Sequence, residues 1–199
     1  DGSQPARSLP LAQGNISFNI NTPDAHRALR CQVIGNMAYF TWGAYLYAVD
    51  LNRKAIAWSR CLLGDMETWP PGTQPFILWD IAAKQWTVNY PDGTRERIYT
   101  QFLATARYVA YYVKDRGLVL AESRTGRLMW EKRLGNPPAD LFGDSRILCV
   151  VTSADRTANS RPQSLVLLAR SGEILPVPDF LPAWQQRNEV FGRFILLCE

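Results

Sequence analysis

Short runs of alternating apolar and polar residues cover most of the chain, and turn residues separate them. Residues 35–58 show the pattern best. After a Gly-Asn turn, apolar runs cover residues 37–42 and 46–49, and a polar turn at 52–54 leads into a run that ends at Trp58. Alternation with a period of two predicts half-buried strands, and Gly or Asn between them permits tight turns. The stretch is predicted to be a β-meander.

The same pattern returns further along the chain. Two more meanders are predicted, with strands at residues 108–113, 118–122 and 128–132, and then at 147–152, 165–169 and 174–177. Residues 188–199 begin a fourth unit, for which one strand is predicted. Between the first two meanders, a Pro-Asp-Gly-Thr turn at residues 91–94 predicts an inserted hairpin, because Pro fixes φ and Gly accepts positive φ.

Other segments depart from this pattern. Residues 1–14 are polar and rich in Pro and Gly, which indicates an arm, and residues 16–20 alternate as a strand does. Short helical turns are predicted at residues 182–190 and 139–142. No long amphipathic helix is predicted.

Alignment on the turns shows a repeat. Asp50 precedes Trp58 by eight positions, and Glu122 precedes Trp130 by the same interval. A repeated acidic residue and Trp at one spacing indicate equivalent positions in equivalent units.

The turn centres align as well. Gly126 lies four residues before its Trp, and Lys54 holds that position in the first unit. Gly172 aligns with Gly126 at a distance of 172 − 126 = 46 residues, and Pro176 takes the place of the third Trp. A period of about 40–50 residues is typical of four-stranded propeller blades. The interval from Lys54 to Gly126 is 126 − 54 = 72 residues, so this unit carries an insertion or a degenerate blade.

These residues resemble the β-propeller repeat of the pyrroloquinoline-quinone type. The matching positions are Ala48, Asp50 and Trp58 in the first copy and Thr125, Gly126 and Trp130 in the second. The resemblance implies an all-β fold: a partial β-propeller of about three to four antiparallel four-stranded blades with an inserted hairpin. It also implies that each Trp packs between adjacent blades, while the acidic residue and the Gly shape the tight turn. Asp50, Trp58, Glu122, Gly126, Trp130 and Gly172 are therefore predicted to be structural repeat positions.

The repeat suggests a division of the chain. Residues 1–28 form an N-terminal arm and a first strand, and residues 29–199 form the repeat region, with units at about 29–103, 104–142, 143–187 and a truncated 188–199. Three to four blades do not close a ring, and an open ring exposes strand edges. We therefore expect the remaining blades in a longer polypeptide, an association of two copies, or arms that seal the array.

Composition excludes several classes of protein. The chain has 199 residues, 47% hydrophobic and 20% charged, with a net charge of 22 − 18 = +4. Its basic residues are scattered, so no nucleic-acid partner is predicted. Its apolar runs fall short of the roughly 20 residues of a membrane helix, so no membrane span is predicted.

Candidate chemistry is sparse. The four cysteines (Cys31, Cys61, Cys149 and Cys198) contain no CxxC pair, and His26 is the only histidine, so no metal site is predicted. Cys31 and Cys61 flank the first meander, and a disulfide between them across neighbouring strands stays open. The adjacent cysteines and calcium ligands that the resemblance implies for quinone enzymes are missing. No catalytic residue and no cofactor are predicted.

Aromatic residues are abundant, with seven Trp, eight Tyr and eight Phe. Most should fill space between blades, whereas Trp69 and Trp79 are candidates for surface binding. The resemblance favours a non-catalytic scaffold or protein-interaction module of a larger bacterial protein, in the periplasm or cell envelope. Its partner would be a protein or the remaining blades. The alternatives are a fragment of a quinone-dependent dehydrogenase whose active site lies on absent blades, and a carbohydrate-binding propeller.

Overall fold

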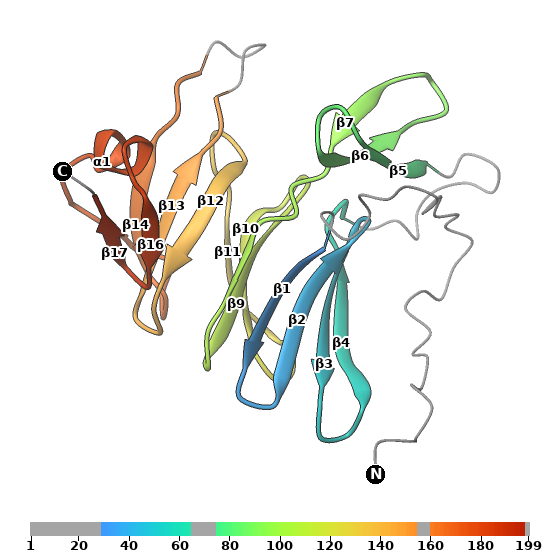
Figure 1. Cartoon of the computed structure of the whole chain (residues 1–199), viewed down its shortest axis with the longest axis horizontal. Coiled ribbons are helices and arrows are strands. Elements are labelled where there is room, and N and C mark those ends of the chain that lie inside the picture. The colour runs from blue at the N-terminus through green and yellow to red at the C-terminus, as the bar shows by residue number, and fades with distance from the viewer. Residues whose placement is uncertain (1–28, 65–74, 155–159, 198–199) are drawn as a thin grey trace.

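The computed structural model describes residues 29–64, 75–154 and 160–197, and nearly all regular structure in them is β-strand (Figure 1). Three four-stranded antiparallel sheets are meanders in which each strand pairs with the next. The predicted all-β partial propeller is confirmed, and these sheets are its blades. The predicted strand at residues 16–20 lies outside the described residues.

The strands of the three blades follow the apolar runs closely. The first blade contains β1 (Arg30–Ile34), β2 (Met37–Trp42), β3 (Tyr45–Asp50) and β4 (Ala55–Cys61). The second blade contains β8 (Phe102–Ala104), β9 (Tyr108–Val113), β10 (Gly117–Glu122) and β11 (Leu128–Lys132). The third blade contains β12 (Pro138–Gly143), β13 (Ile147–Thr152), β14 (Ser164–Leu168) and β15 (Ile174–Leu175).

The insertion is a sheet of its own. Its strands are β5 (Phe76–Asp80), β6 (Gln85–Asn89) and β7 (Arg95–Arg97), so β6 and β7 form the predicted hairpin and β5 pairs with β6 as the third strand. This inserted sheet lies across one end of the first blade, outside the row that the blades form (Figure 1). The first and second blades therefore pack directly on each other.

The chain continues past the third blade with a short helix and a two-stranded sheet. These are α1 (Leu181–Gln185), β16 (Glu189–Phe191) and β17 (Phe194–Leu196). We call β16 and β17 the C-terminal hairpin. The fourth unit thus has two strands where one was predicted, because Gly192 turns the chain back with a φ of +55°.

Strand pairing groups some residues differently from the predicted units. β8 pairs with β9 and belongs to the second blade, although the predicted first unit extends to residue 103. β12 pairs with β13 and belongs to the third blade, although it lies mostly in the predicted second unit. The helical turn predicted at residues 139–142 is wrong, because this segment is part of β12.

Alternation along the strands places the core between blades. In β9, Tyr108 and Ala110 pack towards the third blade, while Val109, Tyr111 and Val113 pack towards the first blade and the inserted sheet. A strand buried on both faces needs apolar residues at successive positions, which explains the continuous apolar run of β9. Each fully buried side chain of this kind stabilises the fold by about 1.5–3 kcal/mol.

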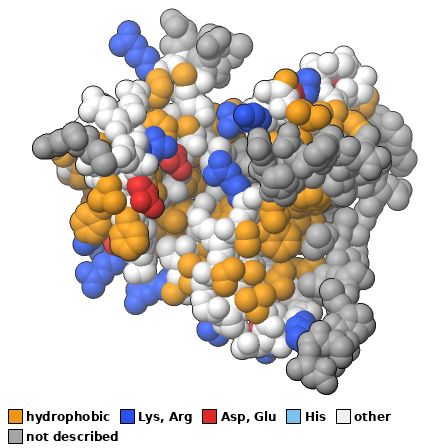
Figure 2. Space-filling view, viewed as in Figure 1, with side chains coloured by type: hydrophobic (Ala, Val, Ile, Leu, Met, Phe, Trp, Pro, Cys, Tyr) orange, Lys and Arg blue, Asp and Glu red, His pale blue; other side chains and the backbone are white. Residues whose placement is uncertain are grey.

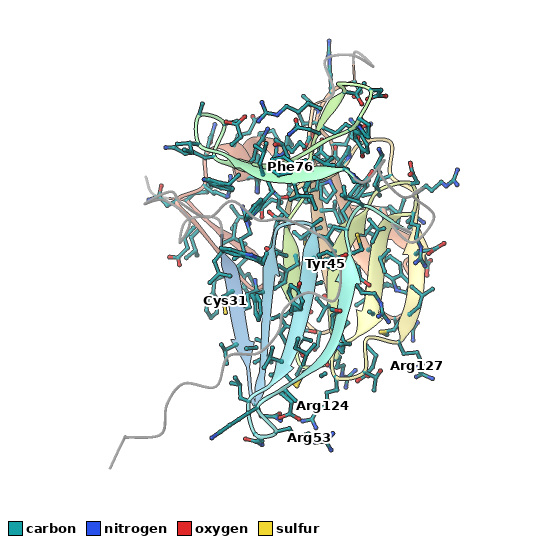
Figure 3. All side chains as sticks on the ribbon, turned by 90° about the vertical axis from the view of Figure 1, so that its right-hand side faces the viewer. Cys31, Tyr45, Arg53, Phe76, Arg124 and Arg127 are labelled. Atoms are coloured by element: carbon teal, nitrogen blue, oxygen red, sulfur yellow. The ribbon has the colours of Figure 1, made fainter. Side chains whose placement is uncertain are left out.

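Cys31 and Cys61 do not form a disulfide with each other. Cys31 lies in β1 and Cys61 in β4, and these strands are the opposite edges of the first blade. Figure 3 shows Cys31 on the strand at one side of this sheet, with Tyr45 of β3 further across it. The disulfide that the sequence left open is excluded because two strands, β2 and β3, lie between the strands of the pair.

Candidate interaction site

A Trp-Gly joint connects the first blade to the second. The Trp58 indole donates its Nε1–H to the backbone carbonyl of Ser123 at 2.9 Å. Its ring lies on Gly126, where a Cβ atom would come within 2.7 Å of the Trp58 Cγ. Arg60 donates to the Gly126 carbonyl at 2.9 Å. Gly126 has a φ of +68°, so the turn and the ring contact both need glycine.

The same joint connects the second blade to the third. Trp130 donates its Nε1–H to the Ala169 carbonyl at 2.7 Å, and its ring lies on Gly172. A Cβ atom at Gly172 would come within 3.0 Å of the Trp130 Cδ2. Both Trp side chains thus occupy the space between blades, where a flat ring contributes a large apolar area and one hydrogen bond.

The acidic repeat residues stabilise the turns beside these joints. Asp50 Oδ1 accepts hydrogen bonds from the backbone N–H groups of Asn52 at 2.9 Å and Arg53 at 3.1 Å. Glu122 accepts from the backbone N–H of Thr125 at 2.8 Å and from its hydroxyl. Hydrogen bonding lowers the pKa of both carboxyl groups, led by the Arg53 N–H at Asp50 and the Thr125 side chain at Glu122.

The series of joints stops at each end. Lys54 has a φ of +51° and lies at the position of Gly126 and Gly172, so its Cβ occupies the place where a Trp ring rests in the other two turns. At the other end, Pro176 replaces the Trp. Figure 3 shows Arg53 at the turn of the first blade, at the same end of the molecule as Arg124 and Arg127 of the neighbouring turn. The first and third blades therefore each make this contact with the second blade, and their outward sides lack the residue that would form another one among the described residues.

The C-terminal hairpin exposes a group of large apolar side chains. Phe191 is 72% exposed, Phe194 is 60% exposed and Leu196 is 49% exposed. Phe191 and Phe194 are direct partners across the two strands. Apolar side chains gather over this hairpin at the left of the space-filling view (Figure 2). We call these three residues the hairpin patch.

The opposite face of the hairpin packs on the third blade. Val190 and Ile195 contact a buried cluster that includes Phe142, Cys149 and Val151. Burial raises the pKa of the Cys149 thiol to about 11, so it stays protonated at neutral pH and behaves as an apolar side chain. The hairpin patch is thus carried on a well-packed support.

Polar contacts also fix this end of the chain. The Trp184 Nε1–H donates to Asp140 Oδ2 at 3.0 Å, and Arg187 lies 3.3 Å from the same oxygen. The Arg187 guanidinium stacks over the Trp184 ring at 3.8 Å from its centroid. Arg193, in the hairpin turn, forms an ion pair with Asp144 at 3.5 Å. These contacts hold the helix and the hairpin on the third blade.

The hairpin patch was not predicted from the sequence, because residues 188–199 were expected to form a single strand.

Of the two Trp residues predicted as candidates for surface binding, Trp79 lies within the described residues. Trp79 lies in β5 and packs edge-on against Trp86, with ring centroids 5.6 Å apart. It belongs to the margin of the first core cluster. Trp69 lies outside the described residues, as do His26 and Cys198.

A cleft of about 260 Å³ separates the inserted sheet from the second blade. Lys114 in this cleft forms an ion pair with Glu96 at 2.7 Å and donates to the Tyr90 hydroxyl at 2.9 Å. Arg97 lies over the Tyr99 ring at 5.1 Å from its centroid. These contacts tie the inserted sheet to the second blade and give the charged side chains partners within the protein.

The described residues contain neither a metal-binding cluster nor a membrane-spanning helix. No group of three or more His, Cys, Asp or Glu side chains suited to a metal ion occurs in residues 29–64, 75–154 and 160–197. Within the same ranges, no helix has the length and apolar character needed to cross a membrane.

Comparison with known proteins supports the fold. No family model matches the sequence, and no curated protein matches it. The structure is similar to a europium-containing methanol dehydrogenase, with a TM-score of 0.50, 13% identity, and coverage of 76% of this chain and 25% of that chain. It also matches BamB from Moraxella catarrhalis, with a TM-score of 0.31, 14% identity, and coverage of 73% of this chain and 49% of that chain.

The fold is that of a β-propeller. The match to the methanol dehydrogenase, at low identity, agrees with the repeat in the sequence. The chain spans between a quarter and a half of the length of these two proteins. An identity of this size shows the fold alone.

Proposed function

We propose that this chain is a non-catalytic β-propeller module that binds a protein partner through the hairpin patch. The observation that carries the proposal is the exposure of Phe191, Phe194 and Leu196 side by side on one face of the hairpin. Soluble proteins seldom leave large apolar side chains together in water, and buried aromatic side chains supply much of the binding energy at protein interfaces.

The contacts beneath the hairpin patch hold it rigid, which favours its use as a binding surface. Asp140 holds both Trp184 and Arg187, and Val190 and Ile195 fill the space above the third blade. A rigid patch loses little conformational entropy when a partner covers it, so more of the apolar burial becomes affinity. The acidic residues of the repeat are engaged in turns, which supports a structural role for them.

Site-specific photo-crosslinking tests this proposal in the cells that make the protein. A photoreactive phenylalanine analogue at position 191 is expected to crosslink one protein species in a saturable manner. The same analogue at Leu128, which is 47% exposed on β11 of the second blade, serves as the matched control. Equal crosslinking from both positions, or none from position 191, would contradict the proposal.

A titration with pyrroloquinoline quinone and Ca²⁺ tests the non-catalytic part of the proposal. We expect dialysis to remove the quinone completely, so that the protein retains no quinone absorption. Retention of one chromophore per chain would instead assign the module to quinone chemistry and refute this part. Equilibrium dialysis of the quinone without Ca²⁺ is the control, because it separates metal-dependent binding from nonspecific adsorption.

A further inference from the structure

Two neighbouring hollows form one groove beside the inserted sheet. The first is the cleft of about 260 Å³ between that sheet and the second blade. The second has a volume of about 330 Å³ and is lined by the β9–β10 turn and by the residues that follow β11. Tyr112 and Asp115 line both hollows, so the two are continuous. Ligand sites in proteins occupy about 300–1,000 Å³, and the groove reaches this range.

Two tyrosine rings form the aromatic part of the groove. Tyr99 and Tyr112 pack edge-to-face, with ring centroids 5.5 Å apart. Burial is the main cause that raises the pKa of the Tyr112 hydroxyl, so this group stays protonated at neutral pH. The face of an aromatic ring carries partial negative charge and attracts polarised C–H groups. The Tyr112 ring therefore suits a ligand whose flat side presents C–H groups.

Charged side chains of both signs surround these rings. Glu96 and Lys114 form an ion pair at 2.7 Å in the first hollow, which Arg97 also lines. Asp115 and Arg133 line the second hollow, and neither forms a hydrogen bond or an ion pair through its side chain with another described residue. The hydrogen-bonding capacity of Asp115 and Arg133 is therefore available to a ligand.

A glycine brings Asp115 and Arg133 to the same hollow. Gly117 has a φ of +92°, and a Cβ atom there would come within 2.4 Å of the Lys132 carbonyl oxygen and 2.8 Å of the Arg133 Cα. The β9–β10 turn can therefore lie directly against the end of β11. Asp115 has a φ of +67°, a conformation that Asp and Asn adopt more readily than most other residues. Two backbone positions with positive φ thus shape the second hollow.

The mixed charge of the groove disfavours most classes of ligand. Glu96 and Asp115 would repel an anionic ligand, and the three basic side chains would repel a cationic one. A wholly apolar ligand would bury charged groups without giving them partners, which is costly. A hydroxyl group both donates and accepts hydrogen bonds, so it satisfies a carboxylate and a guanidinium equally well. The groove therefore favours a neutral ligand with many hydroxyl groups.

We propose that this groove binds a neutral oligosaccharide, with the C–H face of one sugar ring on Tyr112 and its hydroxyl groups bound by Asp115 and Arg133. A chain of sugar units fits a groove of two connected hollows, and each unit combines a C–H face with hydroxyl groups. The residues of the groove belong to the inserted sheet and the second blade, whereas the hairpin patch belongs to the C-terminal hairpin. The inference therefore goes beyond the proposed function and does not depend on it.

A microarray of neutral and anionic glycans tests the inference. The full 199-residue chain is biotinylated and bound to fluorescent streptavidin, so that several weak sites act together on the array. We expect binding to neutral oligosaccharides, and isothermal titration calorimetry with the strongest of them should give one site per chain. Absence of binding to every neutral glycan would overturn the inference, and so would binding to anionic glycans alone.

Two substitutions place the bound glycan in the groove. Asp115→Asn should weaken binding at least tenfold, because it removes the charge that accepts from hydroxyl groups, while Asn tolerates the positive φ. Tyr112→Ala should abolish binding, because it removes the stacking surface. Glu173→Gln removes a charge from the β14–β15 turn and is the matched control, which should bind as the unchanged chain does.

Far-ultraviolet circular dichroism checks that the three variants fold. If Tyr112→Ala does not fold, Asp115→Asn decides, because it changes a single exposed side chain and keeps its size. Unchanged glycan binding by either folded variant would place the glycan elsewhere on the protein and overturn the inference. Crosslinking from position 191 would be unaffected by that result, so the proposed function would stand.

Discussion

Glu122 and Asp50 stabilise equivalent turns in two blades, although their side chains differ in length. Each carboxylate accepts hydrogen bonds from backbone N–H groups two and three residues ahead. In the first blade these donors are Asn52 and Arg53. The longer Glu122 also accepts from the Thr125 hydroxyl, a contact that the first turn does not repeat. A carboxylate at this position thus satisfies donors that a tight turn leaves unpaired.

Replacement of Glu122 by Gln should make the stability of the protein less dependent on pH. The folded pKa of Glu122 lies below its ordinary value of 4.5, so the carboxylate stabilises the fold fully above that value. This contribution disappears as the pH falls from about 4.5 through the lowered folded pKa. Because the side chain is largely exposed, we expect a loss of less than about 1 kcal/mol at pH 7.

Thermal unfolding of both proteins between pH 2 and pH 7 checks this. The difference in melting temperature should be largest at pH 7 and shrink at acidic pH. Glu173→Gln removes the same charge from the exposed turn of the third blade and serves as the control. A difference that stays constant across the pH range would show that the Glu122 carboxylate does not stabilise its turn.

Between elements, the Trp-Gly joint is the contact that sets the blade spacing. The Trp ring seals the wedge between neighbouring sheets, and the missing Cβ lets the ring approach the turn. Because the inserted sheet lies outside the row of blades, the first joint spans the whole insertion in sequence (Figure 1). This placement explains why one repeat interval is much longer than the other.

Replacement of Gly126 by Ala, compared with Gly35→Ala, should separate the effect of a positive φ from the effect of contact with the Trp58 ring. Gly35 has a similar φ of +59° and open space around its missing Cβ, so Gly35→Ala measures the conformational effect alone, about 1 kcal/mol. Gly126→Ala adds a Cβ in collision with Trp58 and should lose about 1–3 kcal/mol more. Urea unfolding followed by Trp fluorescence measures both variants. Equal losses would mean that the ring moves aside without cost.

Across the whole molecule, the two ends of the blade array present different surfaces. Lys54 places a side chain where a Trp from a preceding blade would rest, so the first blade is closed to a joint of that kind. The hairpin end has an unpaired strand edge among the described residues and an exposed aromatic patch. We therefore expect a protein partner to bind at the hairpin end, through the hairpin patch.

The amino-acid sequence by itself determined the strands and the class of fold. Strands at residues 37–42, 108–113, 128–132 and 147–152 were predicted with the bounds that the structure has. Local alternation and turn residues decide such elements. The interval from the acidic residue to the Trp spans one turn and one strand in each unit. It is therefore the same in both units, and the repeat can be recognised from the sequence alone.

Only the tertiary structure decided which strands share a blade and which surfaces stay open. β8 and β12 are assigned by pairing with strands that follow them, and Cys31 and Cys61 are separated by two intervening strands. The hairpin patch could not be predicted, because Phe191 and Phe194 have the same apolar character as buried residues elsewhere. Their exposure depends on the absence of a covering neighbour, and a neighbour is a property of packing over long sequence distances.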